Sequence, residues 1–567
     1  MIELFRRLFH RPVLAAEILA ATLFTTLLTL AMPMYVIQVL NRYVSYGFHG
    51  TLITLTIGMC IAALLQFCFR LIRTKMAAAV NQTPNNRLSE DILALISRAK
   101  AEPMARISKP KIQEALNHVQ TIQQTYTAQN LNATLDAPFS LILIFVIYLL
   151  SPLLAGIALA GIGVALILGW ITLLRSKKTG EKYAEEMSAH KHLNFSAVNN
   201  LEAVRAFCAA PFLSQKWQGQ LNRLSRLNAT LSDYREISQT MTMTGSALTS
   251  VFIYAVGALL VVKGDLSVGA LIGANILSGR AYQNTTKLVQ AVFALSRAKQ
   301  AFSFLSGFTR MPMESTSGTA LKSYTGQLEF HDLGFAYPNT TTPVFESLNL
   351  TLAPGSVLGV TGDNGVGKTT LAKLIVTLLE PKRGSIMADG VNLAQMAPAW
   401  WRRQLIYMPQ EPEFIAGTLK ENILMLNPEL PQETLNEILK TADLRTFLDR
   451  TPEGLETPVT DNEKNFPPGV RRRLSLARAL ASEGKIALLD EPTDALDQKG
   501  VEAVYRVMNQ LARAGKTIVV FTNDPRILKG TGMILNLNRK PVPEIIRKPD
   551  TAQIKSDHIT SDQAGTA

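Results

Sequence analysis

The amino-acid sequence predicts a chain of two folded parts, an α-helical membrane domain of six spans followed by an α/β domain. Six apolar segments lie before residue 300, whereas short apolar runs typical of buried strands stand beside helical patterns further on. The composition agrees, because hydrophobic residues make up 47% and charged residues 18% of the chain. Such a chain is too apolar for an ordinary soluble protein and too polar to lie wholly in lipid.

The length of 567 residues exceeds what one core usually holds, so we expect separate folding units. We place the membrane domain at residues 1–305, a linker at 306–325 and the α/β domain at 326–547. Residues 548–567 are rich in Asp, Ser, Thr, Gln and Lys. They hold too few apolar side chains to build a core, which predicts a disordered tail.

The six apolar segments lie at residues 13–36, 51–72, 133–150, 152–174, 243–263 and 266–288. Most are near the ~20 residues that a helix needs to cross hydrocarbon. The sixth is the weakest, because it is rich in Gly, Ser and Ala. Only Ser151 and Pro152 separate the third span from the fourth, and a few residues around Gly264 separate the fifth from the sixth. We therefore expect two tight reversals outside the membrane.

Basic residues mark one side of the membrane. The opposite loops offer little beyond Arg42 and Lys263, whereas the ends of the first, second and fourth spans carry Arg6, Arg7, Arg11, Arg70, Arg73, Lys75, Arg175, Lys177 and Lys178. Cytoplasmic loops carry the excess of Lys and Arg, so both termini and the polar stretches 76–132 and 176–240 are predicted to be cytosolic. Apolar residues at helical spacing predict that the helices continue through these stretches. The same charges explain the net charge of +13 without a nucleic-acid partner.

Two carboxylates, those of Glu17 and Asp136, fall inside or at the edge of predicted spans. A carboxylate within a membrane is by default a functional residue. Both lie near the cytosolic ends, where a side chain reaches water or basic neighbours. We therefore expect these two groups to be solvated or paired rather than part of a site.

A phosphate-binding loop is predicted early in the α/β domain, between the strand-like residues 357–361 and the helical residues 370–375. Residues 362–369 match the pattern GxxxxGK[ST]. Glycines allow backbone N–H groups to surround phosphate oxygens at a helix N-terminus, Lys368 neutralises the β- and γ-phosphates, and Thr369 offers a hydroxyl to magnesium. The predicted ATP-binding residues are Gly362, Asp363, Asn364, Gly365, Val366, Gly367, Lys368, Thr369 and Thr370.

A second motif follows about 120 residues later, where the apolar run 486–489 ends in Asp490 and Glu491. The run is typical of a buried strand. A carboxylate at its end can hold magnesium, which we assign to Asp490, and the next can polarise a water aimed at the γ-phosphate, which we assign to Glu491. Together the two motifs predict a domain that binds ATP and Mg²⁺.

With these motifs the chain resembles ABC exporters of the half-transporter type, in which two chains pair and enclose two ATP molecules. The resemblance implies that Tyr337 stacks on adenine and that Gln410 contacts magnesium, so that the metal set is Thr369, Gln410 and Asp490. It also implies that residues 494–497 form the loop that crosses the dimer interface and that residues 200–206 lie near the helix that docks on the nucleotide domain.

The chain departs from this family at the signature motif, because Phe466-Pro467-Pro468-Gly469-Val470 stands where the family carries LSGGQ. The helix that follows is kept. In the family, the serine hydroxyl and neighbouring N–H groups bind the γ-phosphate held by the opposite chain. Proline offers neither a hydroxyl nor an N–H. Each lost charge-assisted donor costs about 1.5–3 kcal/mol, so closure on this half should be weak.

The second departure is Asn523, which stands where the family places a histidine after the last core strand. Asparagine hydrogen-bonds a γ-phosphate or the catalytic carboxylate but never becomes a cation. We therefore expect Asn523 and Glu491 to form a catalytic pair with slow turnover. No histidine lies between residues 332 and 557 to replace it.

Within the exporters, residues 33–44, 136–139, 147–152 and 274–281 resemble segments of type I secretion ATPases. This resemblance implies an ATP-driven subunit of the bacterial inner membrane that passes unfolded protein to a periplasmic adaptor and an outer-membrane channel, working as a homodimer or a heterodimer. Two alternatives stay open. One is a general exporter of peptide, lipid or drug, and the other is an ATP-binding regulatory half of a heterodimer.

Overall fold

The computed structural model describes residues 2–547 apart from 45, 48, 339, 341 and 461–465, so the predicted tail lies outside the described residues. The chain forms two compact units. One comprises Met1–Arg98 and Arg106–Met311, and the other comprises Ala99–Ala105 and Pro312–Ala567. The short segment Ala99–Ala105, which we placed in the membrane domain, thus groups with the second unit. The exact domain boundaries stay a prediction.

The first unit consists of helices. They are α1 (Ile2–Phe9), α2 (Pro12–Thr29), α3 (Ala31–Gln38), the π-helical turn η1 (Val39–Val44), α4 (His49–Arg98), α6 (Lys109–Thr125), α7 (Ala128–Leu150), α8 (Pro152–Asn199), α9 (Leu201–Ala206), α10 (Ala210–Val262) and α11 (Val268–Thr309). Local sequence features determine where several helices begin. Proline occupies the first turn of α2 and α8, and the Ser267 side chain accepts a hydrogen bond from Ala270 N at the start of α11. The polar stretches are largely helical, as predicted.

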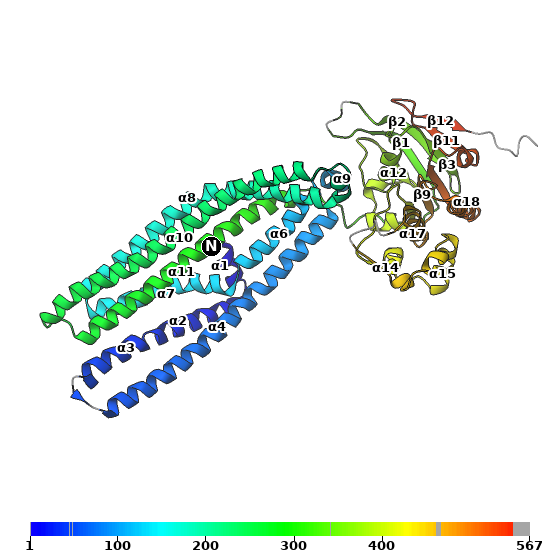
Figure 1. Ribbon diagram of the computed structural model, residues 1–567. Helices are drawn as coiled ribbons and strands as arrows, with labels where there is room; N and C mark the ends of the chain where they lie inside the picture. The colour runs from blue at the N-terminus through cyan, green and yellow to red at the C-terminus, as the bar shows by residue number, and fades with distance from the viewer. Residues whose placement is uncertain are drawn as a thin grey trace, which may run out of the picture. The chain divides into compact units, whose positions relative to one another are not determined.

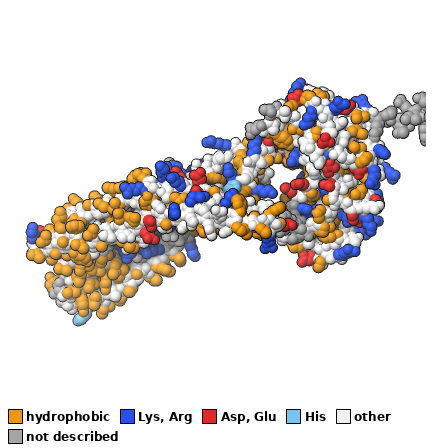
Figure 2. Space-filling view, turned by 45° about the horizontal axis from the view of Figure 1, so that its top comes forward, with side chains coloured by type: hydrophobic (Ala, Val, Ile, Leu, Met, Phe, Trp, Pro, Cys, Tyr) orange, Lys and Arg blue, Asp and Glu red, His pale blue; other side chains and the backbone are white. Residues whose placement is uncertain are grey.

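Five helical segments of the described chain are long and apolar enough to cross a membrane: Pro12–Val44, His49–Arg98, Ala128–Leu150, Pro152–Asn199 and Ala210–Val262. They contain the first five predicted spans except for Lys263, the last residue of the fifth. The sixth predicted span begins two residues before α11 and otherwise lies within it, and α11 does not meet the same measure of length and composition. On the face seen in Figure 2, hydrophobic side chains cover the part of this unit that holds the predicted spans, and Lys and Arg gather further along the helices.

Helix α11 is central to the first unit, because it packs against α3, α6, α7, α8 and α10. Helices α8, α10 and α11 run side by side (Figure 1). Small residues permit close approach: a Cβ atom at Gly269 would lie 2.8 Å from the Ile37 carbonyl oxygen, and one at Gly257 would lie 2.2 Å from Leu271 Cδ1. Two apolar clusters result, one around Ile18, Ile122 and Leu135 and the other along α7, α8 and α11.

The second unit is built on two sheets (Figure 1). The larger sheet has the order β12-β11-β3-β10-β9-β6 and the smaller has the order β2-β1-β4-β5. The strands are β1 (Leu328–Phe335), β2 (Phe345–Leu352), β3 (Val357–Thr361), β4 (Arg383–Ala388), β5 (Val391–Asn392), β6 (Leu405–Met408), β9 (Ile486–Asp490), β10 (Thr517–Phe521), β11 (Met533–Asn536) and β12 (Glu544–Arg547); β7 (Gly417–Thr418) and β8 (Pro458–Val459) pair separately.

Parallel pairing places the chemistry of the second unit at one edge. Strands β3, β9 and β10 are parallel neighbours, so their carboxyl ends meet, and β9 is fully buried as its apolar sequence predicts. The helices of this unit are α5 (Ala101–Ala105), α12 (Lys368–Ile375), α13 (Pro398–Arg403), α14 (Leu419–Leu424), α15 (Gln432–Thr441), α16 (Arg445–Leu448), α17 (Pro468–Leu480), α18 (Gln498–Arg513) and α19 (Pro525–Lys529), with short 3₁₀ turns η2 (Leu393–Gln395) and η3 (Gly454–Glu456).

The predicted linker is partly anchored to the second unit. Glu314 accepts from both terminal nitrogens of Arg402, at 2.9 and 2.7 Å, and Thr319 N donates to Gln395 O at 2.8 Å. Arg402 also donates to the carbonyls of Val376 and Thr377 just after α12. The segment that follows α11 is therefore held close to the helix that starts at the phosphate-binding loop.

Candidate nucleotide-binding site

The loop between β3 and α12 has the backbone that phosphate binding requires. Gly362, Gly365 and Gly367 have φ values of 152°, 81° and 119°, a region that other residues rarely adopt. The loop also leaves no room for a side chain at Gly367, because a Cβ atom there would lie 2.3 Å from Val344 Cγ1. The glycines of the sequence motif are therefore needed for the shape of the loop, which leads into the N-terminus of α12 at Lys368.

Lys368 is buried and its ammonium group has two partners. It donates to Gly362 O at 2.8 Å and forms an ion pair with Glu491 Oε1 at 2.9 Å. The structure thus brings together the predicted phosphate-binding cation and the predicted catalytic carboxylate. Glu491 has a φ of 46°, and its N–H donates to Phe521 O at 2.8 Å, so neighbouring β10 fixes its backbone.

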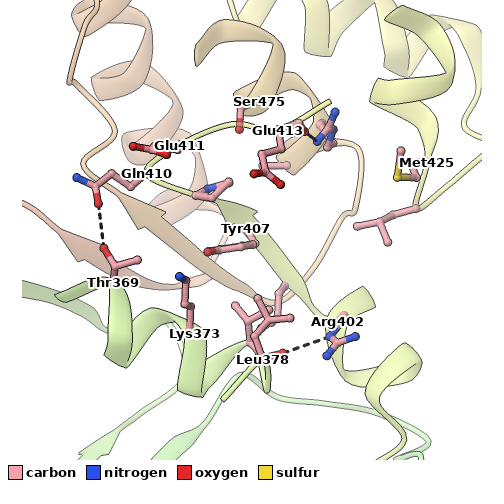
Figure 3. Close-up of a pocket in the computed structure, with 16 residues that line it drawn as sticks. Thr369, Lys373, Leu378, Arg402, Tyr407, Gln410, Glu411, Glu413, Met425 and Ser475 are labelled. Carbon is pink, nitrogen blue, oxygen red and sulfur yellow. Dashed lines mark hydrogen bonds between the residues drawn. The ribbon is translucent and has the colours of Figure 1, made fainter. Parts of the chain in front are cut away.

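The predicted metal ligands lie at the end of β9, just after β6 and in the first turn of α12. Asp490 is 1% exposed, and neither of its carboxylate oxygens makes a hydrogen bond of standard geometry within the described part of the chain. Burial raises the pKa of Asp490, and the Thr369 hydroxyl opposes this shift. Thr369 Oγ1 in turn donates to Gln410 Oε1 at 3.0 Å (Figure 3). A buried carboxylate without a partner, beside a hydroxyl and an amide oxygen, fits the oxygen ligands that Mg²⁺ prefers.

Tyr337, the predicted adenine-stacking residue, lies beside the start of α12. Its hydroxyl is 2.9 Å from Thr370 Oγ1, and its ring meets Phe335 edge to face with centroids 5.0 Å apart. The side chain is 39% exposed. One aromatic face is thus available near the phosphate-binding loop, and the stacking role stays a prediction.

Asn523 contacts the phosphate-binding loop directly. Its Oδ1 atom accepts from Thr361 Oγ1 at 2.9 Å and from Gly362 N at 3.2 Å, and its Nδ2 atom donates to Gly362 O at 3.0 Å. These bonds engage both ends of the amide. In this arrangement Asn523 steadies the first glycine of the loop, and its predicted role beside Glu491 in catalysis stays a prediction.

The signature-like segment begins a regular helix despite its two prolines. Pro467 caps α17, and its carbonyl accepts from Val470 N at 2.9 Å and Arg471 N at 3.0 Å. Pro468 occupies the first helical position, where its missing N–H is tolerated. Gly469 approaches the loop at residues 494–497, since a Cβ atom there would lie 3.4 Å from Ala495 O. The helix is thus retained while its first turn has lost donors.

Two arginines that the sequence placed only on a helix turn out to organise the site. Arg472 is buried, donates to Pro409 O at 2.9 Å and lies 3.6 Å from Asp494 Oδ2. Arg473 binds Asp497 and Asp443. Burial lowers the pKa of Arg472, and Asp494, Asp490 and Glu491 oppose that shift. The sequence feature that could have indicated this role is the run of three arginines, residues 471–473, on a helix that also carries buried leucines.

A groove of about 600 Å³ adjoins Thr369 and Gln410 (Figure 3). Tyr407, Glu413, Met425 and Ser475 are among its lining residues. Burial raises the pKa of the Tyr407 phenol to about 12, so this group is a neutral hydrogen-bonding partner at physiological pH. The groove places a mixed apolar and polar surface next to the predicted magnesium ligands.

The geometry defines a P-loop ATPase, joined in one chain to a set of helices able to cross a membrane. Comparison with known protein families agrees in both parts. The family described as ABC transporter transmembrane region matches residues 16–284, and the family described as ABC transporter matches residues 345–494. The chain belongs to the ABC transporters: it is an exporter half-transporter that couples ATP hydrolysis to transport.

Several bacterial exporters resemble the chain along most of its length. The toxin RTX-I translocation ATP-binding protein of Actinobacillus pleuropneumoniae is 26% identical over 539 residues, covering 93% of this chain and 75% of the relative. The leukotoxin export ATP-binding protein LtxB of Aggregatibacter actinomycetemcomitans is 25% identical with the same coverage. A solved structure of a bacterial Atm1-family ABC exporter with ATP bound has a TM-score of 0.83 at 18% identity, covering 98% of this chain and 100% of that one.

Proposed function

We propose that the chain is the ATP-driven export subunit of a type I secretion system in a bacterial inner membrane, where it moves unfolded protein out of the cytosol. The observation that carries this proposal is its similarity, over 93% of its length, to proteins named for toxin export. The segments at residues 33–44, 136–139, 147–152 and 274–281 support it, because they resemble the spans of that group. The nucleotide domain then lies in the cytosol, and a periplasmic adaptor and an outer-membrane channel complete the route.

The proposed site uses Mg²⁺ with ATP. Thr369, Gln410 and Asp490 would hold the metal, which when bound neutralises phosphate charge. Lys368 and the loop N–H groups bind the phosphates, and Glu491 polarises the attacking water. The prolines at 467 and 468 and the asparagine at 523 favour slow turnover. They remove donors that would face the partner chain and the cation that would stabilise developing charge.

The export proposal is tested in the native bacterium by deleting the gene and restoring it in wild-type or Lys368→Ala form. We expect one or more polypeptides to disappear from the culture medium on deletion, to return with the wild-type gene, and to stay absent with Lys368→Ala. If the secreted polypeptides are unchanged while a lipid, drug or small peptide accumulates inside the cell, the chain is a general exporter and the type I proposal is wrong.

A second candidate is that the chain is the ATP-binding regulatory half of a heterodimer. Pro467 and Pro468 favour it, because a second half-transporter with a complete LSGGQ would face the site of Lys368 and compensate for them. The two roles differ in what Glu491 does. In an active site, Glu491→Gln lowers ATP hydrolysis by the purified complex by about 100-fold or more, the size of a general-base contribution. In a regulatory half, the same change leaves hydrolysis intact.

A further inference from the structure

The first unit contains a concentration of positive charge within its predicted spans. Arg70 lies in the second predicted span and Arg73 one turn further on, and Arg280 lies in the sixth. Arg70 is within electrostatic range of Arg73, Arg280 and Asp136. We name these four residues the arginine cluster. It holds three guanidinium groups and one carboxylate, so two positive charges are left over, and charge inside a membrane marks function by default.

A network of bonds across three helices holds Arg73 and Asp136 in place and joins α4, α7 and α11 around the cluster. On α4, Arg73 binds both carboxylate oxygens of Asp136 on α7, the second at 3.4 Å. Ser140, one turn along α7, donates to Asp136 O at 3.0 Å and accepts from Asn284 Nδ2 on α11 at 3.1 Å. Arg280 precedes Asn284 by one turn, and so lies on the same face of α11. The geometry is thus set by packing and does not depend on a loop.

Only one of the three guanidinium groups has its charge matched. Arg73 is 8% exposed, uses Asp136 as its counter-ion, and keeps a buried Nε atom without a partner. The Arg70 and Arg280 side chains are both exposed, and neither makes a hydrogen bond or ion pair with any part of the chain that the structure describes. Ten N–H donors of these two groups are therefore open to an outside acceptor.

The face of the cluster is better suited to an aqueous path than to lipid. Helix α11 carries Arg280, Asn284 and Lys287 at helical spacing, and it is the predicted span that lacks the composition of a lipid-facing helix. It packs against five other helices, while Arg280 and Lys287 stay exposed. Polar residues at membrane depth face the interior of a bundle or a water-filled cavity. We therefore expect the exposed guanidinium groups of Arg280 and Arg70 to bind an anion that reaches them through water.

We propose that the arginine cluster binds carboxylate groups of the exported polypeptide, so that an acidic segment of the cargo is recognised at the cytosolic half of the spans. This inference rests on the proposed function. Guanidinium forks match carboxylates with two parallel hydrogen bonds, which a lysine or an amide cannot reproduce. Asp136 and Arg280 both fall in segments that resemble type I secretion exporters, which ties the cluster to polypeptide cargo. Asp136 itself holds Arg73 in place, as its predicted pairing with a basic neighbour implied.

The test measures binding of a fluorescent peptide rich in Asp and Glu to the full-length chain in nanodiscs of zwitterionic lipid. The matched peptide carries Asn and Gln instead. We expect the acidic peptide alone to bind, more weakly as salt rises. Arg70→Gln with Arg280→Gln should weaken binding by about tenfold or more, since two charge-assisted contacts are lost. Arg70→Lys with Arg280→Lys should restore part of it.

Arg175→Gln is the matched control, because Arg175 is also an exposed arginine near the cytosolic end of a span. It should leave peptide binding unchanged, and ATP binding at Lys368 should be retained in every variant as a check on folding. The proposal is overturned if the double variant binds the acidic peptide as tightly as the wild type, or if Arg175→Gln weakens binding equally. It is also overturned if the cluster retains only anionic lipid, seen as co-purified lipid that is lost in the double variant. Failure here leaves Lys368-dependent secretion in cells untouched, so it is distinguishable from failure of the proposed function.

Discussion

At the scale of single residues, hydrogen bonds hold the side chains of the nucleotide-binding site in place. Asn523 is an example, because three hydrogen bonds tie it to Thr361 and Gly362. An amide in this place supports the loop but supplies no charge. The histidine that the family resemblance implies at this position can become a cation, whereas Asn523 cannot.

Restoring the imidazole is therefore expected to raise turnover. Asn523→His should increase the rate of ATP hydrolysis about 10-fold, which corresponds to ~1.4 kcal/mol of transition-state stabilisation. The measurement is the rate of phosphate release from the purified transporter at saturating ATP. Asn523→Ala is the control, since it removes the three bonds without adding a cation. A histidine variant no faster than the alanine variant would show that charge at this position is irrelevant.

Asp490 makes stability depend on pH in a defined direction. Burial raises its pKa in the folded state above the ordinary carboxyl value. Between those two pKa values the folded chain binds more protons than the unfolded chain, so the stability of the nucleotide domain falls as pH rises through that window. We expect thermal unfolding with a metal chelator present to show this fall, and Asp490→Asn to abolish it. Added Mg²⁺ should reverse the fall, because it compensates the buried charge.

At the scale of elements, α17 shows a helix kept while its capping chemistry is lost. Pro467 and Pro468 start the helix correctly, yet they offer no hydroxyl and no N–H. Pro467→Ser with Pro468→Gly should therefore strengthen ATP-driven pairing of the nucleotide domains. The ATP concentration for half-maximal association should drop about tenfold or more, as expected for one or two regained donors. We would measure it in the Glu491→Gln background, so that ATP is not consumed.

The control for this change is Pro398→Ser, because Pro398 opens α13 in the same way. It should leave association unchanged. If both variants shift association equally, the effect comes from backbone flexibility rather than from donors at the signature position.

Helix α5 is a short element that groups with the second unit, and two ion pairs join α5 and the residue before it to that unit. Glu102 is paired with Lys382 at 3.3 Å and Lys100 with Glu380 at 2.6 Å. These pairs are partly exposed and contribute only about 0.2–1 kcal/mol each. Lys382→Glu should thus change thermal stability little but reduce secretion, because α5 is continuous in sequence with α4 and α6. Secretion should recover when Glu102→Lys is added; no recovery would mean that this pair is not the cause.

The elements that sequence reasoning predicted well are those whose chemistry is local. The loop at residues 362–369 and the strand ending at Asp490 follow from glycine geometry and an apolar run, and the structure has both. The bonds of Arg472 to Pro409 and Asp494 join segments separated by more than 20 residues in each direction, and no spacing rule predicts them. The same holds for Arg73 and Asp136, whose pairing depends on the packing of α4 against α7.

At the scale of the whole molecule, the identity of the second chain in the dimer decides how many ATP sites have a complete signature motif. Two copies would enclose two ATP molecules, each facing a segment with Pro467 and Pro468. A second half-transporter with a complete LSGGQ would repair one of the two sites. We expect mass spectrometry of the complex purified from native membranes to find such a chain. The mixed pair should hydrolyse ATP faster than the chain purified alone; a complex containing only this chain would contradict the expectation.

The modest apolarity of α11 bears on how the protein is made. A segment with Arg280, Asn284 and Lys287 is a poor candidate to partition into hydrocarbon unaided, whereas α10 just before it is strongly apolar. Only Lys263–Ser267 separate the two. During biosynthesis, α11 is therefore expected to enter the bilayer together with α10 as a hairpin, its polar face shielded by helices already inserted. Mutations that prevent insertion of α10 would then leave the nucleotide domain on the side of the membrane opposite the cytosol, where ATP is not supplied.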